Sequence, residues 1–532
     1  MKTLSIGVIA LSLLTGLLLV EGASGCGGQA QKVRPMAVAG TFYPADPQEL
    51  GKMIDGFLAK ASPPLENVVA LVAPHAGYQY SGSVAAYSYA LLKGRKFDRV
   101  VVIAPSHWEP IDYSSVYDGA AYLTPFGQVP VDQAFAAKLA KMSPTIRLSS
   151  AGHVPSSQRP EHAIEDQLPF LQRVIGQFEL VPVIMGDQSY DACRALGVAL
   201  AKLVAGTNTL IVASSDLSHY HTYDQAVRED HKTLKAIGEY DYFDLSRNLD
   251  LRIWEACGGG PIVATMIAAE RLGANQATVL HYANTGDVTG DYSRVVGYGA
   301  VALVKAAGAA KTDEAPFSLT GPEKSALLKI ARKSVETAVR DGKAYEVSTG
   351  GLEALAQERG AFVTLTKHGE LRGCIGSVAP VKPLFLTVHE VAVMAALRDN
   401  RFSPVTASEL ADLQYEISVL SPLRRVMDVQ EIHIGQHGLL IHALGREGLL
   451  LPQVATEENW DRTTFLQETC RKAGLPGRAW QDPGSDLFRF TALVFNENKP
   501  VAALAPLDLF ANPPGWPSPP APGLPAPRAT LF

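Results

Sequence analysis

Three long apolar runs in this chain each end in a short turn that is rich in small residues and carries a histidine. The runs and their turns lie at Val69–Tyr78, Val100–Trp108 and Leu210–His221. Unbroken Val, Ile and Leu are typical of parallel strands that are buried on both faces. Ligands of open α/β sheets bind beyond the carboxyl ends of such strands. We therefore expect His75, His107 and His219 to meet at one edge of a sheet.

Alternating strands and helices extend this pattern over residues 35–304. The strand candidates are Val68–Ala73, Val100–Ala104, Leu180–Ile184, Leu210–Ala213 and Val295–Leu303. Amphipathic helices, including Gln133–Lys141 and Tyr190–Val204, fall between the strands. Repeated strand–helix–strand units favour a largely parallel sheet with helices on both faces. The predicted fold class of this domain is therefore α/β.

A second domain is predicted over residues 322–504, because a chain of 532 residues is too long for one hydrophobic core. Residues 305–321 are rich in Ala, Gly, Asp and Lys and are interpreted as the linker. Thr320 and Glu323, with a proline between them, are typical of a helix start. The strands and helices expected after it are Ala361–Lys367, Leu413–Leu420, Gly438–Ala443, Leu487–Val494, Leu384–Arg398 and Asn459–Ala473. This mixture indicates a smaller α+β domain.

Residues 1–26 have the pattern of a secretory signal. Lys2 precedes the apolar run Leu4–Val20, and small residues then lead to Cys26. Cys26 stands where a bacterial lipobox has its acylated cysteine, although Ala23 replaces the usual leucine. Lipidation, simple cleavage and an uncleaved anchor all stay open. We expect an exported protein, either a membrane-anchored lipoprotein or a periplasmic or extracellular one, that meets the membrane only through this segment.

The remaining segments and the overall charge set further bounds. Residues 27–34 form a polar tether, and the proline-rich residues 505–532 are predicted to be a disordered tail. The net charge is −6 and no Lys/Arg-rich run occurs, which argues against nucleic acid as a partner. The cysteine spacing fits neither a disulfide framework nor a structural zinc site.

Four residues of the first domain carry the chemistry that the sheet edge would gather: His75, His107, His219 and Cys257. Imidazoles and a thiolate in one pocket indicate a transition-metal site. Cys257 precedes a Gly-Gly-Gly-Pro run at an expected helix start. The backbone amides of a helix start would lower the pKa of its thiol. A small, buried, apolar cysteine is the alternative.

Carboxylates are available for the same site. On a helix, Glu161, His162 and Glu165 would share one face. They would then support a metal ligand or form an acid/base pair. A helix start that prefers acidic residues is the equally weighted alternative. Asp216 stands three residues before His219 and could ligate a metal or orient an imidazole.

Five motifs of this domain, in this order along the chain, resemble the Memo family: APHAGYQYSG, APSHW, EHAIEDQLPF, SSDLSHY and ACGGGPI. The resemblance covers about residues 33–304. It implies a fold similar to class III extradiol dioxygenases, and binding of copper or iron by two histidines and one cysteine. Carried over to this sequence, the metal ligands would be His75, His107 and Cys257. Asp216 and His219 would line the same pocket.

The ligand chemistry leaves three functions open. Two imidazoles and one thiolate suit copper or zinc, and they also admit iron. Non-haem iron dioxygenases normally use two histidines and a carboxylate, so Cys257 weakens the analogy with ring cleavage. The first function is a metal-dependent redox or dioxygenase-like enzyme of unknown substrate, with Asp216, His219 and Glu165 as the catalytic candidates. The others are a protein that binds metal or ligand and recruits a partner, and a metal-dependent hydrolase.

The second domain carries a motif of its own. LRGCIGSV at Leu371–Val378, followed by RFSPVTASEL, YEISVLSP and EGLLLPQVATEENW, resembles the AMMECR family over about residues 322–504. The resemblance implies an α+β domain of unassigned activity. Arg372 and Cys374 are its candidate site, since a nearby arginine would lower the pKa of the thiol. A structural turn with a buried cysteine is the favoured interpretation.

The pairing of the two families points to a partner. The Memo and AMMECR families occur together with a radical-SAM protein in the AmmeMemoRadiSam gene set. This chain lacks the three-cysteine cluster motif of such an enzyme. A separate radical-SAM protein is therefore an expected partner.

Overall fold

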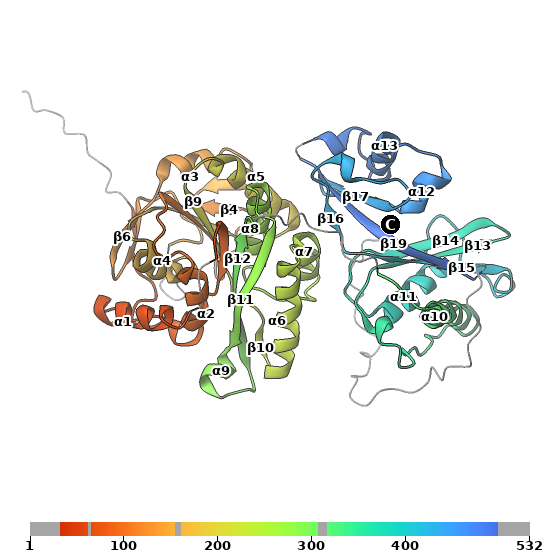
Figure 1. Cartoon of the computed structure of the whole chain (residues 1–532), viewed down its shortest axis with the longest axis horizontal. Helices are drawn as coiled ribbons and strands as arrows, with labels where there is room; N and C mark the ends of the chain where they lie inside the picture. Colours follow the sequence, from red (N-terminus) through yellow and green to blue (C-terminus); the bar gives the residue numbers. More distant parts are fainter. Residues whose placement is uncertain (1–31, 62–64, 155–160, 307–316, 483, 498–532) are drawn as a thin grey trace, which may run out of the picture.

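The computed structural model describes residues 32–61, 65–154, 161–306, 317–482 and 484–497. Two bodies lie side by side in it, one from each half of the chain (Figure 1). The predicted signal at 1–26, with Cys26, and the predicted tail at 505–532 fall outside the described residues. Within the described part of the chain, no helix combines the length and apolar character that crossing a membrane requires.

Four parallel strands form the centre of the N-terminal sheet. In spatial order they are β2 (Val68–Ala73), β9 (Thr209–Ser214), β3 (Arg99–Pro105) and β8 (Glu179–Met185). Each matches a predicted strand to within one residue at either end. The prediction succeeds because strands covered by helices on both faces need an unbroken apolar run, which few other elements of this length show.

On each side of this parallel centre, the next strand pairs antiparallel to it. The flanking strands are β12 (Val295–Val304), β11 (Gln276–Asn284) and β10 (His219–His221) beyond β2, and β4 (Ser114–Val116) and β7 (Ile146–Leu148) beyond β8. The sequence places β12 in a largely parallel sheet, but β12 runs antiparallel to β2 and β11. The link between β11 and β12 holds only the short helix α9 (Thr285–Thr289), and a short link favours an antiparallel return. The α/β class is confirmed, with a mixed sheet.

Helices cover both faces of this sheet. Alternate residues of β3 point to opposite sides, so Val101 and Ile103 join one apolar cluster while Val100 and Val102 join another. The first cluster includes α3 (Gln133–Leu139), α5 (Tyr190–Val204), α6 (Tyr223–Gly238), α7 (Tyr242–Asp250) and α8 (Gly259–Arg271). The second includes α1 (Pro47–Leu58), α2 (Tyr78–Ala90) and α4 (Leu168–Ile175). A separate small sheet consists of β1 (Val33–Arg34), β5 (Ala121–Thr124) and β6 (Gly127–Pro130).

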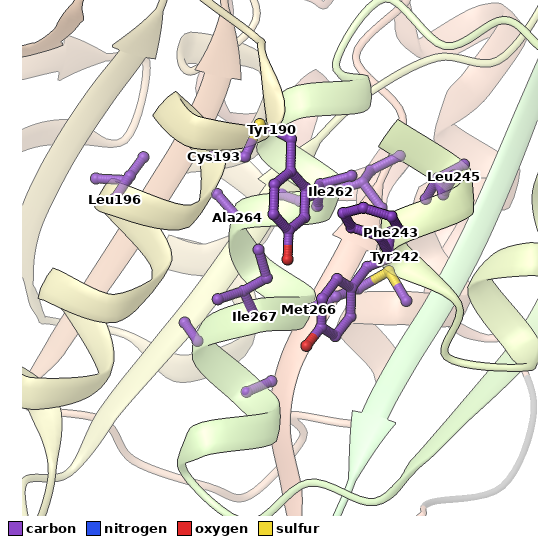
Figure 2. Packing of buried hydrophobic residues seen from close by; sticks show 14 of the residues in the cluster. Tyr190, Cys193, Leu196, Tyr242, Phe243, Leu245, Ile262, Ala264, Met266 and Ile267 are labelled. Atoms are coloured by element: carbon purple, nitrogen blue, oxygen red, sulfur yellow. The ribbon is translucent and has the colours of Figure 1, made fainter. Parts of the chain in front are cut away.

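Helices α5 and α8 pack closely against each other (Figure 2). Gly197 of α5 faces Ala264 and Ile267 of α8. A Cβ atom added at Gly197 would lie 2.7 Å from the Ala264 carbonyl oxygen and 2.8 Å from Cγ2 of Ile267. The missing side chain therefore lets the two helices approach, and this contact fixes the position of α8 and of the residues that precede it.

The C-terminal body is built on one antiparallel sheet. Its strands, in spatial order, are β14 (Glu370–Ser377), β13 (Ala361–Lys367), β15 (Leu413–Leu420), β19 (Asp486–Asn496), β17 (His437–Ala443) and β18 (Arg446–Leu450), with β16 (Arg424–Arg425) beside β19. Helices α10 (Gly321–Asp341) and α11 (Leu384–Leu397) share an apolar cluster with β13 and β15. Helices α12 (Pro452–Glu457) and α13 (Arg462–Lys472) share another with β17. The α+β class is confirmed.

Capping residues set two helix starts in this domain. The side chain of Thr320 accepts a hydrogen bond from the Glu323 amide, and the Glu323 carboxylate accepts one from the Thr320 amide, as predicted for the start of α10. Helix α13 begins three residues later than the sequence predicts. Asp461 caps it by accepting from the Thr464 amide at 2.7 Å, which fixes its first turn after Asp461.

A buried carboxylate joins the two bodies. Asp486 of β19 is 1% exposed and accepts hydrogen bonds from three groups of the N-terminal domain. The donors and distances are Arg194 at 2.6 Å, Tyr190 at 2.8 Å and Arg271 at 3.0 Å. Phe243 of α7 packs on Phe488 of β19 with ring centroids 4.6 Å apart. The two bodies are therefore packed against each other, a feature that the prediction of a plain linker does not contain.

We predict opposite effects for two Gly→Ala substitutions in helices. Gly197→Ala should lower the free energy of unfolding by about 1–3 kcal/mol, because its Cβ overlaps α8. Gly51→Ala in α1, where an added Cβ meets no atom within 4 Å, should raise it by about 0.5–1 kcal/mol. Chemical unfolding of both full-length variants measures the two signs. Equal effects would contradict the close α5–α8 contact.

Candidate metal centre

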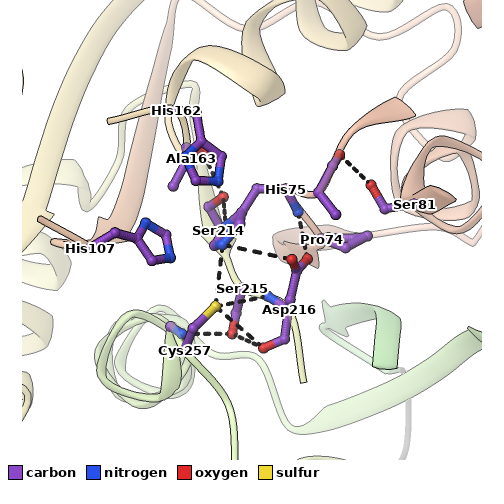
Figure 3. Close-up of polar contacts among 12 residues, drawn as sticks. Pro74, His75, Ser81, His107, His162, Ala163, Ser214, Ser215, Asp216 and Cys257 are labelled. Atoms are coloured by element: carbon purple, nitrogen blue, oxygen red, sulfur yellow. Dashed lines mark hydrogen bonds and ion pairs between the residues drawn. The ribbon is translucent and has the colours of Figure 1, made fainter. Parts of the chain in front are cut away.

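Three neighbouring strands each deliver a functional residue two positions beyond their carboxyl ends. His75 follows β2, His107 follows β3 and Asp216 follows β9. Because β9 lies between β2 and β3 and all three run parallel, these residues emerge side by side. Cys257 directly precedes Gly258, the N-cap of α8, and faces the same edge (Figure 3).

The structure brings the predicted ligand residues together. Sγ of Cys257 lies 3.2 Å from Nε2 of His75. The rings of His75 and His107 have centroids 5.1 Å apart and stand edge to face. One ligand atom from each of His75, His107 and Cys257 lies within 4.8 Å of the other two. Three donors at this spacing can surround a single transition-metal ion.

Hydrogen bonds decide which nitrogen of His75 is available. The single hydroxyl hydrogen of Ser214 goes to the Ala163 carbonyl at 2.6 Å, and Nε2 of Gln167 donates to the Ser214 oxygen at 2.8 Å. Nδ1 of His75 lies 2.9 Å from the same oxygen and must therefore donate to it. The hydrogen of His75 is thus on Nδ1, and the lone pair of Nε2 faces Cys257.

A carboxylate orients the second imidazole in the same way. Glu161 accepts hydrogen bonds from Nδ1 of His107 at 3.0 Å and from the backbone amide of His107 at 2.8 Å. Its Oε1 also accepts from the amides of His162 and Ala163. A carboxylate on Nδ1 leaves Nε2 as the metal-binding atom and raises the basicity of the ring. The predicted supporting role of Glu161 is consistent with this geometry.

The two histidines have opposite pKa shifts. Burial lowers the pKa of His75 well below its usual value, and the neighbouring His107 adds to that effect. Burial also acts to lower the pKa of His107, but hydrogen bonds to Cys257 and Glu161 outweigh it and raise the pKa to about 10. Burial therefore favours the neutral form of His75, whereas Cys257 and Glu161 favour the protonated form of His107.

The predicted lowering of the Cys257 pKa is wrong for the metal-free protein. Burial raises the pKa of this thiol, and the opposing contribution of His107 does not cancel the effect. Its amide neighbours include that of Asp216, which donates to Sγ at 3.3 Å. Burial away from water therefore has a larger effect on the pKa of the Cys257 thiol than the backbone amides of the helix start have.

Asp216 contacts His75, whereas His219 meets Cys257 in a pocket that Asp216, His75 and His107 do not line. Oδ1 of Asp216 accepts from the His75 amide at 2.8 Å, and Oδ2 lies 4.0 Å from Nε2 of His75. Burial raises the pKa of Asp216. Nδ1 of His219 lies 2.9 Å from the Leu217 carbonyl, so this nitrogen carries hydrogen and Nε2 is the acceptor. His219 and Cys257 line one pocket of about 420 Å³, together with Trp254.

Glu165 has a different role from the one predicted. Its buried carboxylate pairs with Arg34 at 2.5 Å and accepts from the amides of Ala37 and Val38 and from the Tyr43 hydroxyl. The helical face shared with Glu161 does not exist, because regular helix geometry starts only at Glu165, with a 3-10 turn η1 (Glu165–Gln167). Glu165 therefore anchors the N-terminal segment and is not a proton-transfer group of the metal centre.

Other neighbours of the site carried a weaker signal in the sequence. His162 stacks on His107 with centroids 4.9 Å apart and lies 5.4 Å from His75. Gln188 ties the Cys257 carbonyl to the Gly260 amide through bonds of 3.0 and 2.7 Å. His162 belongs to a motif noted in the sequence, whereas a lone glutamine between a strand and a helix has no distinguishing pattern.

In the candidate site of the second domain, Arg372 does not activate the Cys374 thiol. Arg372 pairs with Glu409 at 3.0 Å, and it is Arg401 that reaches Cys374, through the Cys374 carbonyl oxygen. The Cys374 amide donates to Asp399, and burial raises the pKa of its thiol. Cys374 is therefore a structural residue of β14.

We predict that metal affinity rises with pH. Binding requires a free Nε2 on His107 and a thiolate on Cys257, and the raised pKa of each group favours its protonated form. Each proton released strengthens binding about tenfold per pH unit below these pKa values. Competition between the full chain and a chromophoric zinc chelator, followed from about pH 6 to about pH 8, measures how steeply the metal affinity changes with pH. Affinity that does not change with pH would contradict the assignment.

Comparisons with known proteins agree with this architecture. The profile of Memo-like proteins matches residues 34–302, and the AMMECR1 profile matches residues 328–495. A MEMO1 family protein of Methanopyrus kandleri is 37% identical over 281 residues, which are 50% of this chain and 98% of that protein. A MEMO1 family protein of Methanobrevibacter smithii is 38% identical over 282 residues, 50% of this chain and 98% of that protein.

A crystal structure of a protein from Pyrococcus horikoshii, titled as uncharacterized, is 37% identical in sequence to the matched part of this chain. The match covers 32% of this chain and 90% of that protein, with a TM-score of 0.32. The family matches confirm the resemblances drawn from the sequence motifs in both halves. The chain therefore belongs to the Memo family, and it carries an AMMECR1 domain after its Memo domain.

Proposed function

We propose that the Memo domain binds one copper or iron ion through His75, His107 and Cys257 and acts as a redox or dioxygenase-like protein. The observation that carries the proposal is the convergence of three donors: Sγ of Cys257 faces Nε2 of His75 at 3.2 Å, and His107 stands beside both. Two imidazoles and one thiolate match the donors that copper, iron and zinc take in proteins.

The surroundings of these donors also fit a bound cation. Nδ1 of each histidine is occupied, by Ser214 for His75 and by Glu161 for His107, so a cation would meet the Nε2 lone pair of His75 and, once His107 has lost a proton, that of His107. Three protein ligands leave room for a further ligand, as in catalytic metal sites. The pocket beside Cys257, which His75 and His107 do not line, provides space for a small substrate next to the sulfur ligand.

The residues around the pocket have distinct tasks in this proposal. A copper or iron ion held there would supply one-electron redox chemistry. Ser214 and Glu161 hold the two rings in place. His219, which lines the pocket, exchanges protons with a bound substrate. Asp216 is buried beside His75 and holds its backbone amide. Trp254, which is 7% exposed, shields one side of the pocket from water.

We propose two further points about the protein in its cell. The segment 1–26 directs export, with the membrane reached only through this segment. A radical-SAM protein is the proposed partner. The substrate or product of that partner is a small molecule or a protein segment that the pocket beside Cys257 receives. These two points rest on the sequence pattern and on the gene set of the two families.

We predict that His75→Ala and Cys257→Ser each lower bound copper or iron at least tenfold while the fold persists, because each removes one of three donors. Cys374→Ser is the matched control, since Cys374 lies in the other domain and holds no metal in this proposal. Elemental analysis of the purified chains and circular dichroism measure metal and fold. Unchanged metal content in both ligand variants would contradict the site.

Oxygen uptake by metal-loaded protein separates the candidate functions. Consumption of dioxygen with catechol-like or thiol substrates, lost in His75→Ala, supports the redox or dioxygenase-like enzyme. Bound metal without turnover favours a binding protein. Bound zinc with cleavage of ester or amide substrates favours a hydrolase.

The mass of the mature N-terminus tests export. We predict a chain that begins at or near Cys26 when the protein is isolated from its host, since the small residues before it form the expected cleavage site. A diacylglyceryl adduct on Cys26 identifies a lipoprotein, and its absence identifies simple cleavage. A chain that keeps Met1 and fractionates with the cytoplasm would contradict export.

A further inference from the structure

Two helices of the Memo domain, α5 and α8, begin beside the candidate metal centre and are held from the AMMECR1 domain. Cys257 stands just before the N-cap of α8, and Gln188 stands just before the N-cap of α5. Gln188 donates to the Cys257 carbonyl at 3.0 Å and accepts from the Gly260 amide at 2.7 Å. The position of the candidate sulfur ligand therefore depends on where these two helices begin.

The turn that carries Cys257 is closely packed. A Cβ atom added at Gly260 would lie 2.7 Å from Cβ of Gln188, and one added at Gly258 would overlap the Ser214 carbonyl oxygen. Closely packed protein interiors are stiff and pass small displacements on to the groups that they contact. A shift at the start of α5 would therefore move Cys257 relative to the two histidines.

The start of α5 is fixed by a carboxylate of the AMMECR1 domain. Tyr190, the first residue of α5, donates to the buried Asp486 at 2.8 Å, and Arg194 donates to the same carboxylate oxygen at 2.6 Å. The Tyr190 ring packs against Phe243 with centroids 4.8 Å apart (Figure 2) and against His442 of the AMMECR1 domain at 4.9 Å. Tyr190 lies only two residues after Gln188.

A second polar contact joins the same turn of α5 to the AMMECR1 domain. Nε2 of His442 lies 2.9 Å from Asp191, and its Nδ1 lies 3.2 Å from Glu447. Burial acts to lower the pKa of His442, but the hydrogen bonds to Asp191 and Glu447 raise it to about 9. The protonated ring then donates to one carboxylate in each domain.

The far end of α8 meets the same carboxylate as the start of α5. Arg271, the last residue of α8, donates to Asp486 at 3.0 Å. Arg425 of β16 donates to Asp486 at 3.3 Å and to Glu270 of α8 at 3.2 Å. One buried carboxylate of the AMMECR1 domain thus holds the first turn of α5 and the last turn of α8.

We propose that Asp486 is a positioning residue for the candidate metal centre. It docks the AMMECR1 domain onto α5 and α8, and Gln188 then holds Cys257 where the sulfur meets His75 and His107. This inference rests on the proposed metal site. It gives the AMMECR1 domain a defined task, because the docking of the two domains sets the metal affinity of the site.

Titration of the full chain with cobalt(II) tests this proposal. Imidazoles and thiolates both bind this ion, but only a thiolate gives a sulfur-to-cobalt charge-transfer absorption. We expect Asp486→Asn to weaken cobalt affinity about tenfold or more and to lower this absorption per bound cobalt. Asp486→Glu, which keeps the carboxylate, should restore part of both. Unchanged affinity and absorption in Asp486→Asn would overturn the proposal.

Glu497→Gln is the matched control. Glu497 pairs with Arg332 at 2.7 Å and accepts from the Tyr415 amide, both within the AMMECR1 domain. Its loss removes a carboxylate–arginine pair without touching α5 or α8, so cobalt affinity should stay unchanged. Circular dichroism verifies the fold of each variant. A loss of affinity as large as that of Asp486→Asn would overturn the proposal, because general destabilisation of the AMMECR1 domain would then explain both.

A double-mutant cycle tests the route through Gln188. Gln188→Ala alone should also weaken cobalt binding about tenfold, because it releases the turn after Cys257. If Asp486 acts through Gln188, the variant with both changes binds cobalt about as weakly as either single variant. Additive losses would overturn the proposed route.

Tyr190→Phe provides a test that does not depend on the folding of Asp486→Asn. It keeps the ring and removes only the hydroxyl that donates to Asp486, so we expect cobalt affinity about threefold weaker. Unchanged affinity would overturn the proposal. In the unaltered chain the sulfur-to-cobalt absorption should be present, and it should vanish in Cys257→Ser. Its absence from the unaltered chain would contradict the metal centre itself, whereas its presence at full strength in every interdomain variant would overturn this inference alone.

Discussion

The parallel pairing of β2, β9 and β3 is the constraint on which the rest of the candidate metal centre depends. Backbone hydrogen bonds hold the three strands in a register that brings their carboxyl ends to one edge. His75, Asp216 and His107 each stand two residues past a strand end. A slip of one residue in any pair would turn the following side chain away from its neighbours. Long-range backbone pairing therefore positions residues that are far apart in sequence.

Backbone position alone does not make a ligand, and hydrogen bonds to the far side of each ring complete the site. Ser214 fixes the hydrogen of His75 on Nδ1, and Glu161 does the same for His107. Both rings thus present Nε2 toward Cys257. Mutation of supporting groups of this kind typically lowers metal affinity or activity by about 10–100-fold.

Residues whose role follows from strand ends could be predicted from the sequence. The apolar runs before His75 and His107 mark buried strands, and the Gly-rich run after Cys257 marks a helix start. Glu165 could not be placed this way, because its partner Arg34 lies 131 residues away and no pattern links them. The contact of Asp486 with Arg194 and Arg271 could not be predicted either, because a single sequence does not reveal which surfaces of two domains meet.

X-ray absorption spectroscopy at the edge of the bound metal tests the central claim most directly. A copper- or iron-loaded chain should show one sulfur neighbour at about 2.3 Å and two imidazole nitrogens at about 2.0–2.1 Å. The sulfur contribution should disappear in Cys257→Ser while the imidazole scattering remains. A shell of nitrogen and oxygen alone in the unaltered chain, or a sulfur neighbour that survives Cys257→Ser, would contradict the account.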